Sequence, residues 1–318
     1  MKTLSYSITG IGTAVESVSI NESYSTQVSR CSIKCTSHSL SLGDSITVGI
    51  GYTGDTPTVF KGYVTGIADE ILPGIHEISC QDVLWRAAQH WIVATDLANP
   101  FRRTNIAVED LIGDLLAEAG ITNYSGDSPG FTLATGVQPA EFQLVSSLDA
   151  CNQVADIVAW HIYADQGGTV HFKNIIPEPG SSSASFVTGT SGTIITANQK
   201  INTDNLRNKV VVFGYPPITA EAHASSSYLP AGFYKTAIIA SPLIDTQSMA
   251  DGTASYNLNK WNRAAYSIDI EVEGDPDLHA RQTVSVTESF TGASGDWFVY
   301  DVTHDFQKQY ITRMTLVK

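Results

Sequence analysis

A stretch of about forty residues occurs twice in this chain, once near each end: Leu40–Ile78 aligns with Leu278–Leu316 without a gap. Alternating apolar residues predict half-buried strands, and a shared Thr-Gly turn predicts a hairpin connection. We therefore expect a duplicated small β-barrel; the alternative is that two amphipathic meanders match by coincidence. The matched positions are Leu40 with Leu278, Ile46 with Val284, Val48 with Val286, Tyr52-Thr53-Gly54 with Phe290-Thr291-Gly292, Phe60 with Phe298, Val64-Thr65 with Val302-Thr303, and Ile78 with Leu316.

The charge balance limits the classes of partner. The chain has 318 residues, of which 18 are basic and 32 acidic, so its formal net charge is −14. A field of this sign repels nucleic-acid phosphates and anionic membranes, which argues against a sequence-specific DNA- or RNA-binding protein. Plain solubility explains the charge equally well. No apolar leader follows Met1, and no run of about eighteen apolar residues predicts a membrane-spanning segment.

Between the two copies the pattern changes from strands to helices. Apolar residues at three–four spacing predict a helix from Val108 to Gly120, which Asn105 can cap. A second helix, Leu148–Val158, leads into a β-hairpin that turns at Gly167-Gly168. The segment Pro177–Thr193 has the composition of a linker. Residues 215–241 carry little signal, and a third helix is expected over 246–263.

These patterns predict an α+β, β-rich fold with two similar small β-barrel domains and an α/β domain between them. The expected limits are 1–100 for the first β-barrel domain, 101–200 for an α/β insert domain with two helices and a β-hairpin, and 201–318 for the second β-barrel domain with an added helix. Inward-facing positions of the matched strands should form the barrel cores. The predicted barrel-core residues are Val48, Phe60, Val64, Val286, Phe298 and Val302.

Three residue pairs have the types that chemistry requires, and each has a simpler interpretation. Cys151 and His161 could form a Cys–His nucleophile, but Cys151 lies on an apolar helix stripe. His161 and His171 could face each other across the hairpin as half a metal site, yet no further ligand has suitable spacing. The pair Asp301 and Asp305 could act in glycoside hydrolysis, although solvated acids at a hairpin rim explain them better. We therefore expect no enzyme, no metal site and no cofactor.

Cys31 and Cys35 are four residues apart in an expected strand, which places their Cα atoms roughly 13 Å apart. A disulfide needs Cα atoms within about 7 Å. These cysteines are therefore expected to be small buried thiols in a reducing cytoplasm.

The order of elements resembles the baseplate hub proteins of tailed bacteriophages. It is also similar to the hub parts of siphophage tail-tip proteins and of type VI secretion spikes. The resemblance covers nearly the whole chain as an order of elements, and its individual motifs are apolar strands and turns, which are not a catalytic signature. It rests on the strand Phe60–Val64, the helices Val108–Gly120 and Leu148–Val158 with the Gly-Gly hairpin, the run Asn205–Gly214, and the closing hairpin Tyr300–Lys318 with His304 and Thr312.

The resemblance implies a structural hub that forms a homotrimer, in which three chains with two barrels each imitate a ring of six. Such a trimer is a symmetry adaptor between a sixfold tail tube or distal tail protein and a threefold spike or tip protein, with other baseplate proteins around it. Its place is then the virion tail, assembled in the bacterial host cytoplasm. The chain ends just after the second barrel, so a needle or wall hydrolase is expected to be a separate polypeptide.

The ring would enclose the DNA-exit channel, and an acidic lining would repel DNA. Asp269, Glu271 and Glu273 are the candidate lining residues, with a plain solvent-facing strand as the alternative. Two other functions stay open: a receptor- or carbohydrate-binding tail-tip module, with Trp297, Tyr300 and Tyr310 as an aromatic platform, and a cell-wall hydrolase that would depend on His161 or Asp301.

Overall fold

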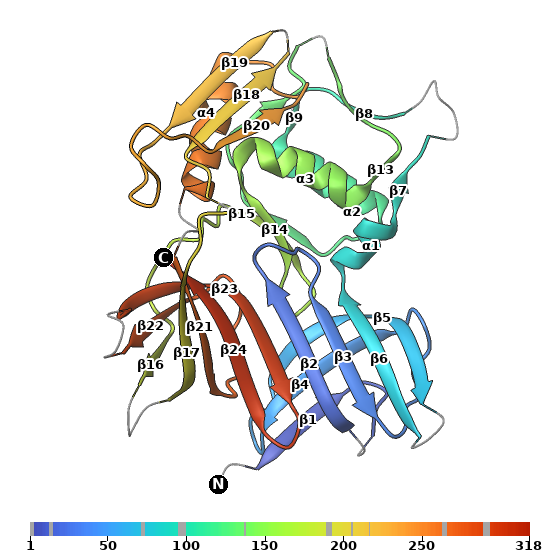
Figure 1. Ribbon diagram of the computed structural model, residues 1–318. Coiled ribbons are helices and arrows are strands. Elements are labelled where there is room, and N and C mark those ends of the chain that lie inside the picture. Colours follow the sequence, from blue (N-terminus) through green and yellow to red (C-terminus); the bar gives the residue numbers. More distant parts are fainter. Residues whose placement is uncertain are drawn as a thin grey trace.

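The computed structural model describes residues 3–12, 15–70, 74–94, 100–136, 138–188, 193–204, 206–215, 217–262, 266–288 and 293–318. The chain forms two tiers, with strands below and a mixed layer of helices and short sheets above (Figure 1). This β-rich α+β fold is the class that the sequence predicted. Among the described residues, no helix combines the length and the apolar character needed to cross a membrane.

Six strands near the N-terminus surround a core of their own, and we call this unit the first barrel. Its strands pair in the order β1-β4-β5-β6-β3-β2, and its core contains Ile20, Ile33, Val48 and Val64. The strands are β1 (Leu4–Ile8), β2 (Val15–Ser23), β3 (Arg30–Cys35), β4 (Ser45–Tyr52), β5 (Thr58–Glu70) and β6 (Ile75–Asp82).

A second unit of six strands, the second barrel, surrounds a separate core that contains Ile270, Val286, Trp297 and Val302. Its strands pair in the order β16-β22-β23-β24-β21-β17. The strands are β16 (Ala184–Val187), β17 (Ile194–Ile201), β21 (Tyr266–Glu273), β22 (Thr283–Thr287), β23 (Gly295–Phe306) and β24 (Tyr310–Val317).

The two barrels have the same strand order, because β1 to β6 correspond in turn to β16, β17, β21, β22, β23 and β24. The expected duplication is therefore present, and it extends beyond the aligned residues to three further strands in each barrel. One direction differs: β1 is antiparallel to β4, whereas β16 is parallel to β22. The matched turn at 290–292 lies outside the described residues.

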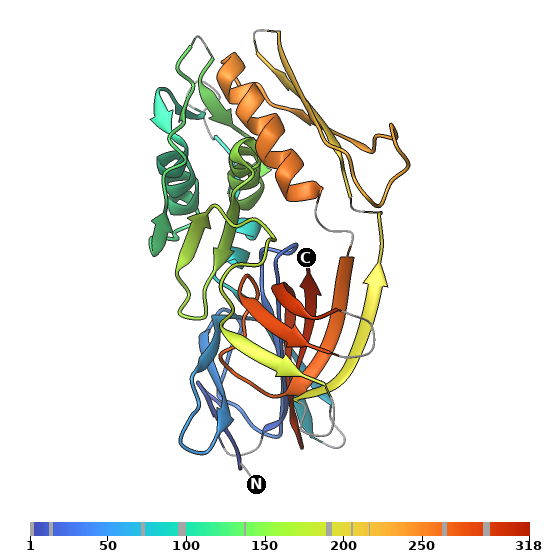
Figure 2. The same cartoon turned by 90° about the vertical axis from the view of Figure 1, so that its left-hand side faces the viewer.

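The upper tier packs around a third core, to which the helices contribute Leu111, Leu115, Val154 and Met249. The helices are α1 (Leu84–Gln89), α2 (Val108–Glu118), α3 (Ser147–Val158) and α4 (Gln247–Trp261). Helix α4 contacts α3 on one side and the β18–β19–β20 sheet on the other (Figure 2). The strands here are β7 (Trp91–Ile92), β8 (Phe101–Arg103), β9 (Ile106–Ala107), β10 (Tyr124–Gly126), β11 (Thr132–Leu133), β12 (Ala140–Phe142), β13 (Val145–Ser146), β14 (His161–Ala164), β15 (Val170–Lys173), β18 (Lys209–Gly214), β19 (Ile218–His223) and β20 (Thr236–Ala240).

The buried cores group the residues differently from the expected limits at 100 and 200. Strands β16 and β17 belong to the second barrel although they lie in the segment 101–200. Conversely, β18, β19 and α4 lie in the segment 201–318 but bury Val210, Ala220 and Met249 in the upper core. The linker interpretation of 177–193 missed β16, and the low-signal region 215–241 contains β19 and β20. These strands are short and expose every second residue, so only their pairing partners identify them.

The predicted barrel-core residues are all buried, but one lies in a different cluster. Val48, Phe60 and Val64 are in the first core, and Val286 and Val302 are in the second. Phe298 instead packs with Tyr24 and Val317, between the second barrel and the upper tier. The reason is a β-bulge between Val299 and Asp301, which shifts the side-chain alternation along β23. The bulge of β5 comes at a different point, between Val64 and Gly66. In a gapless alignment, some matched residues of β5 and β23 therefore point to opposite faces of their strands.

Candidate assembly interface

The two barrels are joined by a continuous sheet. Strand β2 pairs antiparallel with the second half of β23, from Val18 opposite Phe306 to Ser23 opposite Asp301. On one face of this junction the Ser19 hydroxyl donates to Asp305 Oδ1 at 2.7 Å. This pairing makes one sheet of the order β6-β3-β2-β23-β24-β21-β17, which runs across the lower tier in Figure 1.

The hairpin between β23 and β24 closes the junction by inserting into the first barrel. Phe306 and Tyr310 come from the second barrel's strands, but they are buried in the first barrel's core. The Phe306 ring packs edge-on against Tyr6, with ring centroids 6.0 Å apart. The Tyr52 hydroxyl of β4 donates to the carbonyl oxygen of Gly274 at 2.9 Å. The junction is therefore held by apolar contacts as well as by the strand ladder.

His304 sits fully buried at the centre of this junction. Its Nε2 donates to the Leu278 carbonyl at 2.9 Å, and its Nδ1 lies 2.8 Å from the Tyr310 hydroxyl. Because Nε2 must carry the proton for the carbonyl, Nδ1 accepts from the tyrosine, which is the pattern of a neutral imidazole. Burial agrees with this state, since it lowers the pKa of His304 to about 4.

The edge of β17 is the counterpart of β2, but within the described chain no strand covers it. Strand β17 pairs with β21 on one side only. Ile195 and Ile201 are 57% and 61% exposed. By contrast Val18 and Ile20 on β2 are fully buried, because β23 and its hairpin cover them. An uncovered strand edge with bare isoleucines is a template for pairing with another chain.

A second edge is open on β5, the counterpart of β23. Strand β4 covers β5 only from Thr58 to Tyr63, whereas β6 pairs with it from Gly62 onward. In the part of the chain that the structure describes, the side of β5 away from β6 has no strand partner beyond Val64. The corresponding half of β23 is the part that β2 occupies. The free edges of β17 and β5 lie at opposite flanks of the lower tier (Figure 1).

The face of the joined sheet that points away from both cores is polar. The predicted lining residues Asp269 and Glu271 lie on it, opposite Thr315 and Arg313 of β24. Asp269 pairs with Lys200, and Glu271 accepts from Arg313 Nε at 2.6 Å. This hydrogen bond holds the pKa of Glu271 below its usual value. Glu273, at the end of β21, lies 3.4 Å from the Tyr52 hydroxyl.

The same polar face continues across β2, β3 and β6 of the first barrel. Short hydroxyl side chains and paired charges alternate there, as at Ser32 and at Lys34, whose Nζ lies 3.8 Å from Glu77. Asp301 and Asp305 also lie on this face, within β23 and not at a hairpin rim. Asp305 forms an ion pair with Arg313 on the face of the sheet. Sequence reasoning found the acids of β21 but missed their basic partners Lys200 and Arg313, which are distant in sequence.

The residues considered for chemistry occupy separate places. Cys151 is buried in α3, where burial raises the pKa of its thiol, and the other three cysteines are buried and free. His161 stacks on Tyr24 with centroids 4.5 Å apart, and burial lowers its pKa. Across the hairpin His161 is opposite Lys173, while His171 is opposite Tyr163, so the two histidines do not face each other. His171 Nε2 lies 2.8 Å from Asp165 Oδ2.

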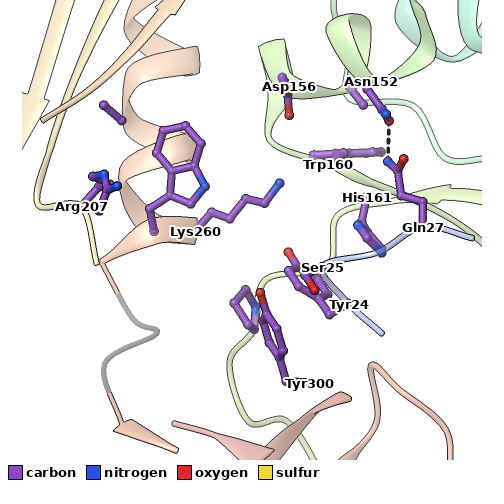
Figure 3. A pocket seen from close by; sticks show the side chains of 14 residues that line it. Tyr24, Ser25, Gln27, Asn152, Asp156, Trp160, His161, Arg207, Lys260 and Tyr300 are labelled. Carbon is purple, nitrogen blue, oxygen red and sulfur yellow. Dashed lines mark hydrogen bonds between the residues drawn. The ribbon is translucent and has the colours of Figure 1, made fainter. Parts of the chain in front are cut away.

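A cleft of about 550 Å³ opens between the barrels and the upper tier (Figure 3). Lys260 of α4 points into it from one side, with Asp156 and Trp160 opposite. Burial lowers the pKa of Lys260 and raises that of Asp156. Asp156 is the one carboxyl group among the described lining residues, so paired carboxylates for glycoside hydrolysis are not assembled there.

The aromatic residues considered as a carbohydrate platform do not form one. Trp297 and Tyr310 are buried in the second and first cores, with 0% and 3% exposure. Tyr300 is partly buried and lines the cleft. A platform for sugar stacking needs exposed ring faces, and these three side chains do not supply it together.

Solved structures share this fold along almost the whole chain. A tail protein from Neisseria meningitidis MC58 matches with a TM-score of 0.76 at 14% identity, over 99% of this chain and 97% of that one. The 43 kDa tail protein of prophage MuSo2 from Shewanella oneidensis matches at 0.75 and 13%, over 99% and 98%. An Escherichia coli type VI secretion component, described as similar to T4 bacteriophage tail proteins, matches at 0.60 and 10%, over 98% and 76%. No protein-family profile and no curated protein matches the sequence.

Proposed function

We propose that this protein is a structural hub of a phage tail or tail-like particle, in which three copies form a ring of six barrels. The fold supports a tail role, because the two solved structures with the higher TM-scores are both tail proteins. The observation that carries the proposal is the pair of free edges. One chain already contains a β2–β23 junction, and it leaves open the two edges that would repeat that junction with a neighbour.

In this arrangement β17 of one copy pairs with β5 of the next. The two edges are different surfaces on opposite flanks, so the contact is heterologous and propagates in one direction. It closes into a ring if each junction turns by the same fraction of a circle. Two barrels per chain then give six barrels from three chains. A threefold object thereby presents a nearly sixfold surface to a tail tube and a threefold surface to a spike or tip protein.

The polar face of the joined sheet would line the central channel. It has short hydroxyl groups, paired charges and acids such as Asp269 and Glu271, and it lacks the apolar side chains of the barrel cores. Such a surface offers DNA few binding sites, because carboxylates repel phosphates and the basic groups of Lys34, Lys200 and Arg313 are already paired with acids. We place the protein in the virion tail baseplate, assembled in the bacterial host cytoplasm, without enzymatic activity.

The mass of the purified protein in solution tests the proposal. Sedimentation at increasing concentration should reveal a species of three chains of 34.2 kDa each. A stable dimer, or a chain that stays single at every concentration and also when mixed with its tube and spike partners, would overturn the ring.

A further inference from the structure

The end of β5 and the start of β6 lie at the end of the first barrel that is remote from α2 and α3 (Figure 1). Three side chains with metal-ligating groups meet there. His38 lies in the connection between β3 and β4, Asp69 lies near the end of β5, and His76 lies at the start of β6. One ligating atom from each residue lies within 4.8 Å of the other two. These residues come from three places in the sequence, so no spacing motif reveals them.

The strand ladder holds two of the three residues in place. Asp69 and His76 are direct partners across β5 and β6, and His76 is also opposite Cys35 of β3. His76 Nδ1 and Asp69 Oδ1 are 2.7 Å apart. The ring of His38 packs edge-on against His76, with centroids 4.9 Å apart. Carboxylate and imidazole thus converge in a site that is built largely by backbone pairing.

We propose that His38, Asp69 and His76 bind one divalent transition-metal ion of the zinc, cobalt or nickel type. Two imidazoles and a carboxylate are typical donors for such ions, whereas calcium and magnesium prefer oxygen ligands alone. Tetrahedral coordination with bonds of about 2.1 Å places ligand atoms about 3.4 Å apart. The present separations therefore need only small movements of side chains that are 30% exposed at His76 and 63% exposed at Asp69. Water completes the coordination.

Binding requires one change in the local hydrogen bonds. His38 Nδ1 accepts from the Leu40 amide at 3.2 Å, at the long end of the hydrogen-bond range. If Nε2 of His38 coordinates the ion, its proton moves to Nδ1 and this bond is released. If Nδ1 coordinates, the same bond is released directly. Metal binding therefore exchanges one long hydrogen bond for a coordinate bond that ties the β3–β4 connection to the β5–β6 hairpin.

The second barrel supplies an internal comparison. When the gapless alignment of the two copies is extended by two residues at its start, the three positions correspond to Pro276, Gln307 and Met314. Neither a proline nor a neutral amide replaces the imidazole and carboxylate donors, so the site is specific to the first barrel. It needs only that barrel's own residues, and it goes beyond the hub function because it stands whether or not three chains assemble.

Titration of the full, untagged and metal-free chain tests the site. With Co²⁺ followed by visible absorption and Zn²⁺ followed by calorimetry at neutral pH, we expect one ion per chain. His38→Ala and His76→Ala should each abolish this binding, and Asp69→Asn, which removes a charged ligand, should weaken it at least about 10-fold, the lower limit for loss of an outer-shell partner. The matched control is His223→Ala, because His223 is an exposed histidine 3.6 Å from Glu221 in a different sheet. This control should leave the affinity unchanged.

Two results would overturn the proposal: a wild-type chain that binds no ion, or a double variant His38→Ala/His76→Ala that binds Zn²⁺ as the wild type does. Circular dichroism melting of the metal-free variants separates loss of ligands from loss of fold. Zn²⁺ should raise the melting temperature of the wild type and of His223→Ala, but not that of His76→Ala. Because ions are counted per chain, these outcomes are distinguishable from a failure of the ring to form.

Discussion

The free edge of β17 gives the sharpest test by mutation, through the double variant Ile195→Asp/Ile201→Asp. These side chains are 57% and 61% exposed in the single chain, so the change should leave its fold intact. In the ring they would be covered by the neighbour's β5. Full burial of an isoleucine contributes about 1.5–3 kcal/mol, so covering the exposed parts of both side chains contributes about 2–3.5 kcal/mol per junction.

The aspartates remove that contribution and place charges at the contact. Each junction should therefore weaken by at least about 2 kcal/mol, which is about 30-fold in its association constant. Sedimentation equilibrium over a concentration series measures the shift, with Ile238→Asp as the control. Ile238 is 69% exposed but belongs to the upper-tier strand β20, so its variant should assemble as the wild type does. Unchanged assembly of the β17 variant, with its melting curve also unchanged, would refute the assignment of this edge.

Three further predictions concern stability. Val302→Asp should lower the free energy of unfolding in urea by about 3 kcal/mol or more, because it places an unpaired charge in the second core, where Val302 is fully buried. A urea midpoint equal to that of the wild type would mean that this side of β23 does not face the core. His304 has a pKa of about 4 in the folded chain and 6.5 in the unfolded chain, so between these pH values the unfolded chain binds more protons than the folded chain. The free energy of unfolding should therefore fall by up to about 3 kcal/mol as pH falls from about 6.5 to about 4. His304→Gln should flatten this pH dependence of stability, and a dependence equal to that of the wild type would exclude His304 as its source. Tyr52→Phe removes the hydrogen bond to Gly274 between the barrels and should cost about 1 kcal/mol in thermal or urea unfolding, and a loss near zero would mean that water replaces this bond.

Local pattern was sufficient for the elements with strong periodicity. The matched strands are present as β4 to β6 and β22 to β24, and the helix predicted to start at Val108 begins there and ends at Glu118. Its N-cap is Ala107 and not Asn105, which has a positive φ of 49° in the turn before it. Apolar spacing defines such elements, because the buried face must repeat with the period of the backbone.

The other elements could not be predicted from local sequence, because they depend on which strands and helices pack together in the tertiary structure. Strand β17 is exposed along nearly its whole length, so its sequence carries no core-facing stripe to mark it. Strand β18 is apolar enough to be recognised, but only the packing of α4 against it assigns it to the upper tier. The Phe298 side chain lies outside the predicted core, because one bulged position in β23 changes which side chains face inward. The cluster of His38, Asp69 and His76 exists only because three separate connections meet at one barrel end.

Electron microscopy of the assembled particle tests the central claim most directly. The account predicts three chains around one channel, with six barrels in a ring, β17 of each chain beside β5 of the next, and Asp269 and Glu271 facing the channel. A particle in which β17 stays uncovered, or in which the polar sheet face points outward, would contradict it.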